Sequence, residues 1–427
     1  MAASPLSNDP SAPPGGLRKL LLAQTASQFG FRLMTLTLPI LAVTELHASP
    51  FQVSLVAAGQ TAAFLLLGLP AGALVDRVRK RPVMVFCDLG RCLVLAGLPV
   101  AWAAGVLSVG YLCGAALAVG VLTVFFDIAD QSYLPHVVGR EQLVPANAKL
   151  ASIEQVSGVA GPGVGGLVIQ LATAPLAVIG TAFGYLWSAV WLLRIHDREP
   201  RPARRPGARL HRDIAAGMRY VVQDRLLRPI VLCSTTMTLC WSIAYAMLLV
   251  LLAKNLAVPA GTIGLLLTAG GAGGVLASAA AGPLIRRLGD GTVVRLSVLV
   301  AAPFTLLAAL TGPGWRLCLV AVANFAFAAG VVLYNVAQVS FRQRSVPPEL
   351  LSRVNATVRF FAWGARPIGS LCGGTAAELI GVRGAVWIGA AGTSLACLWL
   401  YLSPLRTLRD LPLRLPTAEP EPQSSAA

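Results

Sequence analysis

The stretch that decides the fold is LPAGALVDRVRKRP, residues 69–82. An apolar span without a charged residue, 51–73, leads into it, and a second apolar span begins at Val83. Because a helix needs roughly 20 apolar residues to cross a bilayer, the stretch is predicted to be a short turn between two membrane helices. Arg77, Arg79, Lys80 and Arg81 crowd this turn. So many cations in one connection predict that it faces the cytoplasm.

The composition is typical of a polytopic membrane protein. Of 427 residues, 56% are hydrophobic and only 12% are charged, whereas about a quarter are charged in soluble domains. The mean hydropathy is +0.71. The net charge of +16 comes from cations that lie between alternate apolar spans. The positive-inside rule accounts for that charge, so nucleic acid is not an expected partner.

The apolar spans number twelve, six on each side of a polar stretch at 195–228. This pattern predicts an all-α polytopic membrane protein with 12 transmembrane helices in two pseudo-symmetric six-helix lobes. Cationic loops follow the even-numbered spans, which predicts that both termini are cytoplasmic. The expected organisation is a disordered tail at 1–16, a lobe at 17–194, a linker with an interfacial helix at 195–228, a lobe at 229–404 and a disordered tail at 405–427.

The two halves of the chain share an internal repeat. REQLVPANAKL at 140–150 aligns with PELLSRVNATV at 348–358, and DIADQS at 127–132 aligns with NVAQVS at 335–340. The offset is about 210 residues, half of the chain. A parallel repeat of six helices about the membrane normal is the plan of two-lobed transporters.

The turn at 72–81 resembles the signature turn between helices 2 and 3 of the major facilitator superfamily. Arg79 departs from this pattern, because the family has glycine there. The resemblance implies a network of the turn's acid and cations that bridges to the other lobe and latches one face of the transporter. Cations that only set the topology are the alternative. The matching residues are Gly72, Asp76, Arg77, Lys80 and Arg81.

The segment SGVAGPGVGG, residues 157–166, is similar to the Gly-Pro motif in helix 5 of proton-coupled drug antiporters. Its matching residues are Gly161, Pro162, Gly165 and Gly166. A second small-residue run, TAGGAGGVLASAAAG, lies at 268–282. Because small residues let helix backbones approach closely, we expect these two helices to pack together across the lobe interface.

From 17 to 402 the chain resembles bacterial exporters of the enterobactin-exporter and macrolide-efflux type. The resemblance implies a secondary active exporter, with the proton gradient as its energy source and no other cofactor, in a bacterial inner membrane. One feature departs from these exporters. An acid common in their helix 1 is replaced by Phe31 in SQFGFR, with Arg32 next to it.

Several ionisable residues interrupt the predicted spans. A charge deep in a span costs at least ~2.5 kcal/mol on insertion scales, so each needs a partner or a function. These residues either line a central cavity and carry coupling protons or form fixed ion pairs. Asn335 and Gln338 repeat the positions of two of the acids as neutral amides, which favours the acidic copy for coupling. The ionisable candidates are Arg32, Asp127, Asp130, Glu154 and Arg359.

The sequence shows no enzyme site. The four histidines share no metal-ligand spacing, and no nucleophile, metal or nucleotide motif is present. We therefore expect a monomer in the lipid bilayer that moves a small apolar or amphipathic organic compound, such as a drug, a macrolide or a siderophore. The embedded arginines leave room for an anionic group on it. A lysophospholipid flippase, an importer on the same scaffold and a non-transporting membrane sensor stay open as alternatives.

Overall fold

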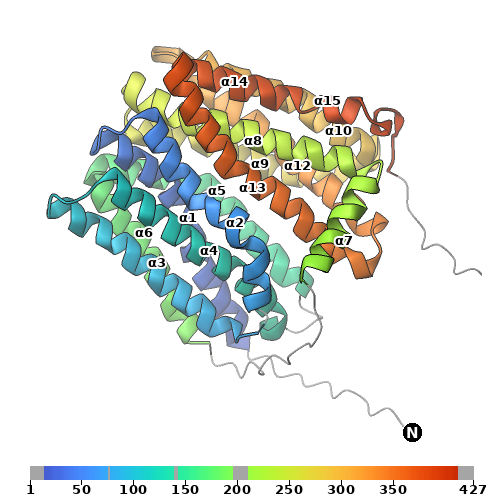
Figure 1. Ribbon diagram of the computed structural model, residues 1–427, viewed down its shortest axis with the longest axis horizontal. Coiled ribbons are helices and arrows are strands. Elements are labelled where there is room, and N and C mark those ends of the chain that lie inside the picture. The colour runs from blue at the N-terminus through green and yellow to red at the C-terminus, as the bar shows by residue number, and fades with distance from the viewer. Residues whose placement is uncertain (1–13, 76, 139–142, 196–209, 412–427) are drawn as a thin grey trace, which may run out of the picture.

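The computed structural model describes residues 14–75, 77–138, 143–195 and 210–411. Within these ranges the chain forms helices gathered into two lobes, one blue to green and the other yellow to red in Figure 1. The first lobe consists of α1 (Pro14–Thr44), α2 (Pro50–Val75), α3 (Lys80–Ala103), α4 (Val109–Val138), α5 (Leu143–Ala172) and α6 (Ala174–Leu193).

The second lobe repeats the pattern with more interrupted helices. Among the described residues, ten helical segments are long and apolar enough to cross a membrane, and α5 and α13, of 30 and 33 residues, complete six spans in each lobe. The second lobe consists of α8 (Leu227–Val250) with η1 (Leu251–Asn255), α9 (Ala260–Leu288), α10 (Asp290–Ala301) with η2 (Ala302–Thr305) and α11 (Leu306–Ala309), η3 (Gly314–Leu317) with α12 (Cys318–Ser345), α13 (Pro348–Ile380), and α14 (Val382–Leu395) with α15 (Leu398–Tyr401).

The two lobes use the same helix pairs. In the first lobe α1 packs against α5 and α6, and α2 packs against α4. In the second lobe α8 packs against α13 and α14, and α9 packs against α12. Each second-lobe helix occupies the place of its counterpart six spans earlier. The two-lobed all-helical fold predicted from the repeat is therefore confirmed.

The interface between the lobes consists mainly of α2 against α13 and α5 against α9. Glycines allow the close contact between α5 and α9. A Cβ atom on Gly166 would lie 2.9 Å from the Cα of Gly264, and a Cβ on Gly264 would lie 3.0 Å from the Cα of Gly166. Further along, Gly271 lies against the backbone of Val159. The close packing expected from the two small-residue runs is present in the structure.

Gly166→Ala is expected to destabilise the protein by about 1–3 kcal/mol, because the added methyl group overlaps α9. Gly158→Ala, on the same helix, is the matched control, since a Cβ there meets open space. That control is expected to gain up to about 1 kcal/mol from the better helix propensity of alanine. Melting temperatures in one detergent check both, and equal shifts in the same direction would contradict a tight α5–α9 contact.

The ends of the lobes differ from the prediction. α1 begins at Pro14 rather than at residue 17. Residues 405–411, assigned to a disordered tail, are ordered, because the side chains of Leu405 and Leu411 are buried and the Leu411 amide donates to Asp290 Oδ1 over 2.7 Å. The predicted tails otherwise fall on residues 1–13 and 412–427, outside the described part of the chain.

The linker contains α7 (Leu210–Gln223), which packs against α13 and, to a lesser extent, α8. Gly217 permits the close approach, since a Cβ atom there would lie 2.6 Å from the Arg353 carbonyl oxygen. Val221 is buried, whereas Met218, three residues earlier on the helix, is exposed. α7 is therefore docked on the second lobe along one side and exposed along another.

Candidate functional site

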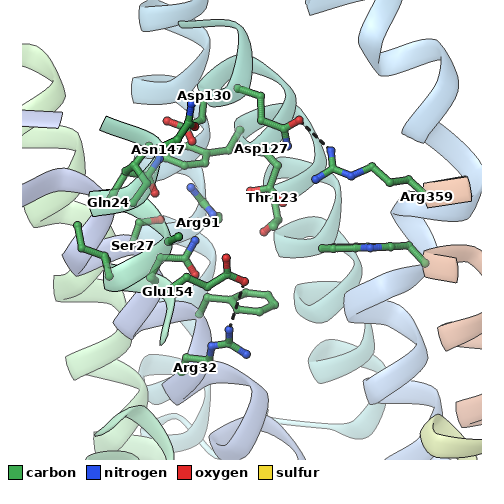
Figure 2. A pocket seen from close by; sticks show the side chains of 18 of the residues that line it. Gln24, Ser27, Arg32, Arg91, Thr123, Asp127, Asp130, Asn147, Glu154 and Arg359 are labelled. Atoms are coloured by element: carbon green, nitrogen blue, oxygen red, sulfur yellow. Dashed lines mark hydrogen bonds and ion pairs between the residues drawn. The ribbon is translucent and has the colours of Figure 1, made fainter. Parts of the chain in front are cut away.

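Two adjoining cavities lie between the lobes, with volumes of about 400 and 590 Å³. Helices α1, α3, α4 and α5 of the first lobe and α13 of the second supply the walls of the smaller one, drawn in Figure 2. The larger one extends toward α2 and α12. Four residues line both cavities and so join them: Asp127, Gln131, Arg359 and Trp363.

Helix α4 supplies two acids to the smaller cavity. Asp127 and Asp130 are three residues apart, so their side chains lie on one face of the helix. Both line the cavity, as predicted from the sequence, and Figure 2 shows them near each other on its wall. Among the described residues, neither acid has a cation within ion-pair distance. An acid at this depth without an ion pair is costly and therefore marks a candidate functional residue.

The third predicted acid is paired with the predicted arginine of α1. Arg32 Nη2 lies 3.8 Å from Glu154 Oε1 on α5, and both side chains are partly open to the cavity. Gly161 makes this possible, because a Cβ atom there would lie 2.6 Å from the Cβ of Arg32. An ion pair this long and this exposed is weak and is free to separate.

Helix α13 supplies arginines from the second lobe. Arg359 and Arg366 are seven residues apart, about two helical turns, and therefore share a face. Arg359 Nη1 donates to the amide oxygen of Gln131 on α4 over 2.8 Å, which joins the two lobes across the cavity (Figure 2). The guanidinium of Arg366 lies 4.6 Å from the ring centroid of Trp363, a cation–π contact.

The structure contains a buried ion pair that sequence reasoning missed. Asp88 and Arg91 on α3 are bonded to each other with 0% and 2% of their side chains exposed. The guanidinium of Arg91 lies 4.3 Å from the ring centroids of both Phe126 and Tyr185, and Arg91 also reaches the smaller cavity. The available signal was the spacing D-x-x-R within an apolar span, since residues three apart on a helix can pair.

The two neutral candidates of the second lobe do not line either cavity. Gln338 is buried and donates to Asn335 Oδ1 over 3.2 Å. The side-chain amide oxygen of Gln338, Oε1, accepts a hydrogen bond from Arg342 Nη1 over 3.1 Å. The prediction that Asn335 and Gln338 belong to the cavity is therefore wrong. Arg342 holds them in a hydrogen-bonded chain, and the repeat has Leu134 at the position equivalent to Arg342.

The residues of the signature turn lie in different surroundings, and the predicted latch stays a prediction. Gly72 lines the larger cavity, and Arg77 is exposed. Lys80 Nζ donates to the Val78 carbonyl oxygen over 3.0 Å, within the turn itself. Asp76, the centre of the proposed network, lies outside the described residues.

Arg81 also bonds to the end of a neighbouring helix. Arg81 donates to the carbonyl oxygens of Leu192 and Leu193 at the C-terminal end of α6, within its own lobe. A cation at a helix C-terminus is favoured by the helix dipole. In the second lobe, Asp290 at the start of α10 pairs with Arg344 of α12.

The Gly-Pro motif of α5 faces two neighbours. Gly161 and Gly165 lie against α1, and a Cβ atom on Gly165 would lie 3.5 Å from Cγ of Leu33. Gly166 contacts α9, and the carbonyl oxygen of Pro162 lies where a side chain on Gly264 would be. The motif therefore positions α1 and its Arg32 as well as the lobe interface.

Sequence comparison identifies relatives along nearly the whole chain. Residues 11–425 match the family described as transmembrane secretion effector. The multidrug efflux pump Tap of Mycolicibacterium fortuitum is 27% identical, with 86% of this chain and 91% of that protein covered. The enterobactin exporter EntS of Escherichia coli O1:K1 / APEC is 26% identical, with 92% and 94% covered.

Solved transporter structures share the fold at low identity. A POT family transporter in complex with 5-aminolevulinic acid superposes with a TM-score of 0.74 at 11% identity, covering 92% of this chain and 97% of that one. A bacterial homologue of the iron transporter ferroportin, in an inward-facing state, gives 0.69 at 17% identity, covering 90% and 98%. The chain is therefore a multi-pass membrane transporter, not an enzyme, and belongs to the transmembrane secretion effector family of the major facilitator superfamily.

Proposed function

We propose that the protein is a proton antiporter that exports a small amphipathic organic compound across a bacterial inner membrane by alternating access. The observation that carries the proposal is the cavity between the lobes, whose acids Asp127 and Asp130 have no ion-pair partner among the described residues. A proton and a substrate that compete for such an acid are coupled in opposite directions. The names of the relatives, an efflux pump and an exporter, support export.

The contacts between the lobes support an inward-facing state. Near the end of the bundle opposite the linker, Ser49 Oγ donates to Glu378 Oε1 over 3.1 Å, and Lys254 Nζ donates to the Ala48 carbonyl oxygen over 3.1 Å. At the same end the Gly261 amide donates to Gln170 Oε1 over 3.1 Å. These bonds join the lobes on the side away from the cationic loops. By the positive-inside rule the linker and both termini are then cytoplasmic, and the cavity is on the cytoplasmic side of this seal.

Expression in a bacterial host without its own drug pumps tests this function. A panel of toxic amphipathic compounds is loaded, and accumulation is measured with and without a protonophore. We expect lower accumulation of at least one compound than in cells with an empty vector, and we expect the protonophore to remove the difference. A difference that persists without the proton gradient would exclude proton antiport, and higher accumulation would indicate import.

A further inference from the structure

Among the described residues, the charges without an ion-pair partner that line the cavities are acids in the first lobe and arginines in the second. The first lobe also supplies Arg32 and Arg91, but Glu154 and Asp88 are their partners. The remaining charges are the two acids of α4, the two arginines of α13 and Arg342 of α12, which donates to neutral Gln338. Among the described residues, no cavity-lining acid comes from the second lobe. Figure 2 shows Arg359 extending toward the side that carries Asp127.

These two sets of charges do not neutralise each other directly. Among the described residues, no ion pair within 4.0 Å joins Asp127 or Asp130 to Arg359 or Arg366. The hydrogen bond of Arg359 goes to neutral Gln131. One carboxylate oxygen of Asp130, Oδ1, is buried without a hydrogen-bond partner. Charges at membrane depth need counter-charges, so a ligand that supplies both signs is favoured here.

The larger cavity provides an apolar surface next to these charges. Phe64, Phe360 and Trp363 line it, and the ring centroids of Phe64 and Trp363 are 4.4 Å apart. Trp363 also lines the smaller cavity, so the aromatic surface continues into the charged one. A ligand with an apolar ring and a charged end can therefore occupy both cavities at once.

We propose, building on the proposed export function, that the transported compound is an amphipathic zwitterion. Its acidic group binds Arg359 and Arg366, its amino group binds Asp127 and Asp130, and its apolar body lies against Trp363. An anion alone competes with Asp127 for the nearby charges of Arg91 and Arg359, supplies no positive charge to the acids of α4 and adds repulsion. A cation alone leaves the arginines of α13 unpaired. Only a ligand with both charges satisfies both walls.

The zwitterion also explains how a proton drives export. An ammonium group and a proton compete for the same carboxylate of Asp127, so substrate leaves when the proton enters. A bound anion would instead favour protonation of Asp127. Anion and proton would then bind and move together, which is symport rather than antiport. The amino group is therefore the part of the substrate that gives antiport, and the acidic group anchors it to the second lobe.

Binding of four matched compounds to the purified full-length protein tests the proposal without a proton gradient. The compounds are 2-naphthylalanine, a zwitterion, and its N-acetyl, methyl ester and N-acetyl methyl ester derivatives, which are an anion, a cation and a neutral molecule. We expect the zwitterion to bind about ten-fold more tightly than either singly charged derivative, because each of those derivatives loses the hydrogen bonds to one charged wall. Isothermal titration calorimetry at neutral pH measures the affinities.

Substitutions in the cavity test which residues bind the acidic group of the ligand and which bind its amino group. Arg366→Gln is expected to weaken binding of the zwitterion and the anion about ten-fold and not to weaken binding of the cation, which loses a repelling charge. Asp127→Asn is expected to weaken binding of the zwitterion and the cation about ten-fold and not to weaken binding of the anion, which loses a repelling charge. Arg316→Gln is the matched control, because that exposed arginine lies outside both cavities. If Arg366→Gln does not fold, as judged by its melting curve, Arg359→Gln replaces it.

Three outcomes overturn the proposal: an anion that binds as tightly as the zwitterion, a cation that does so, or no charged compound that binds better than the neutral one. A failure of proton-driven export in cells with selective zwitterion binding in solution would refute antiport but leave the substrate class standing. Proton antiport of a compound that carries a single charge would support antiport but refute the zwitterion as the substrate class.

Discussion

Asp127→Asn is expected to abolish proton-driven export and to leave the protein folded in the membrane. Asp127 lines both cavities, and among the described residues no cation lies within ion-pair distance of it. Asparagine has nearly the same shape but cannot take up or release a proton. Because the acid is the site at which proton and substrate compete, its loss uncouples the two. The chain has an asparagine, Asn335, at the repeat-equivalent position of the second lobe.

Transport into inside-out vesicles with an imposed pH gradient measures the effect. Glu45→Gln is the matched control, since it also removes one acid but at a site where the side chain only accepts a hydrogen bond from Trp102. We expect the control to keep wild-type uptake and Asp127→Asn to retain only gradient-independent movement. Undiminished gradient-driven uptake by Asp127→Asn would refute its assignment as the coupling acid, and Asp130→Asn is then the next variant to measure.

The lobes and spans were predictable because the bilayer imposes them. A fixed hydrocarbon thickness sets the length of every span, and the cationic loops follow from the positive-inside rule. The α5–α9 contact was predictable for a similar reason, because runs of small residues in a membrane helix have few uses other than close packing. In both cases the sequence pattern reflects a constraint that acts on a whole helix.

The individual site residues depend on how helices are rotated and paired, which local sequence does not state. The pairing of Arg32 with Glu154 needs Gly161 to bring α1 against α5. Asn335 leaves the cavity although its counterpart lines it, because the second lobe has Arg342 where the first has an apolar residue. For Arg32, Glu154 and Asn335, sequence reasoning could therefore name the residues but not their partners.

The buried pair on α3 was overlooked for a related reason. Asp88 and Arg91 carry opposite charges and stand among apolar residues, so the window around them still has the hydropathy of a membrane span. Nothing in that window shows whether the pair faces lipid or the interior of the lobe. The structure settles this, because both side chains are almost fully buried between α3, α4 and α6.

Removing one partner of this pair is expected to destabilise the first lobe strongly. In Asp88→Leu the guanidinium of Arg91 loses its only ion-pair partner within the described residues while it stays buried between Phe126 and Tyr185. An uncompensated buried charge of this kind costs about 3–5 kcal/mol. Arg91→Leu is expected to cost a similar amount, because it leaves the Asp88 carboxylate buried and unpaired. Melting temperature and the yield of monodisperse protein measure both variants.

The double variant Asp88→Leu/Arg91→Leu separates the charge effect from packing. Leucines at both positions leave no buried charge, and replacing a buried ion pair by apolar residues is often neutral or stabilising. We therefore expect the double variant to melt well above either single variant, even though it loses the contacts of Arg91 with Phe126 and Tyr185. If the double variant is as unstable as the sum of the two single variants, the pair is not coupled, and the packing of the arginine between two rings is what stabilises the lobe.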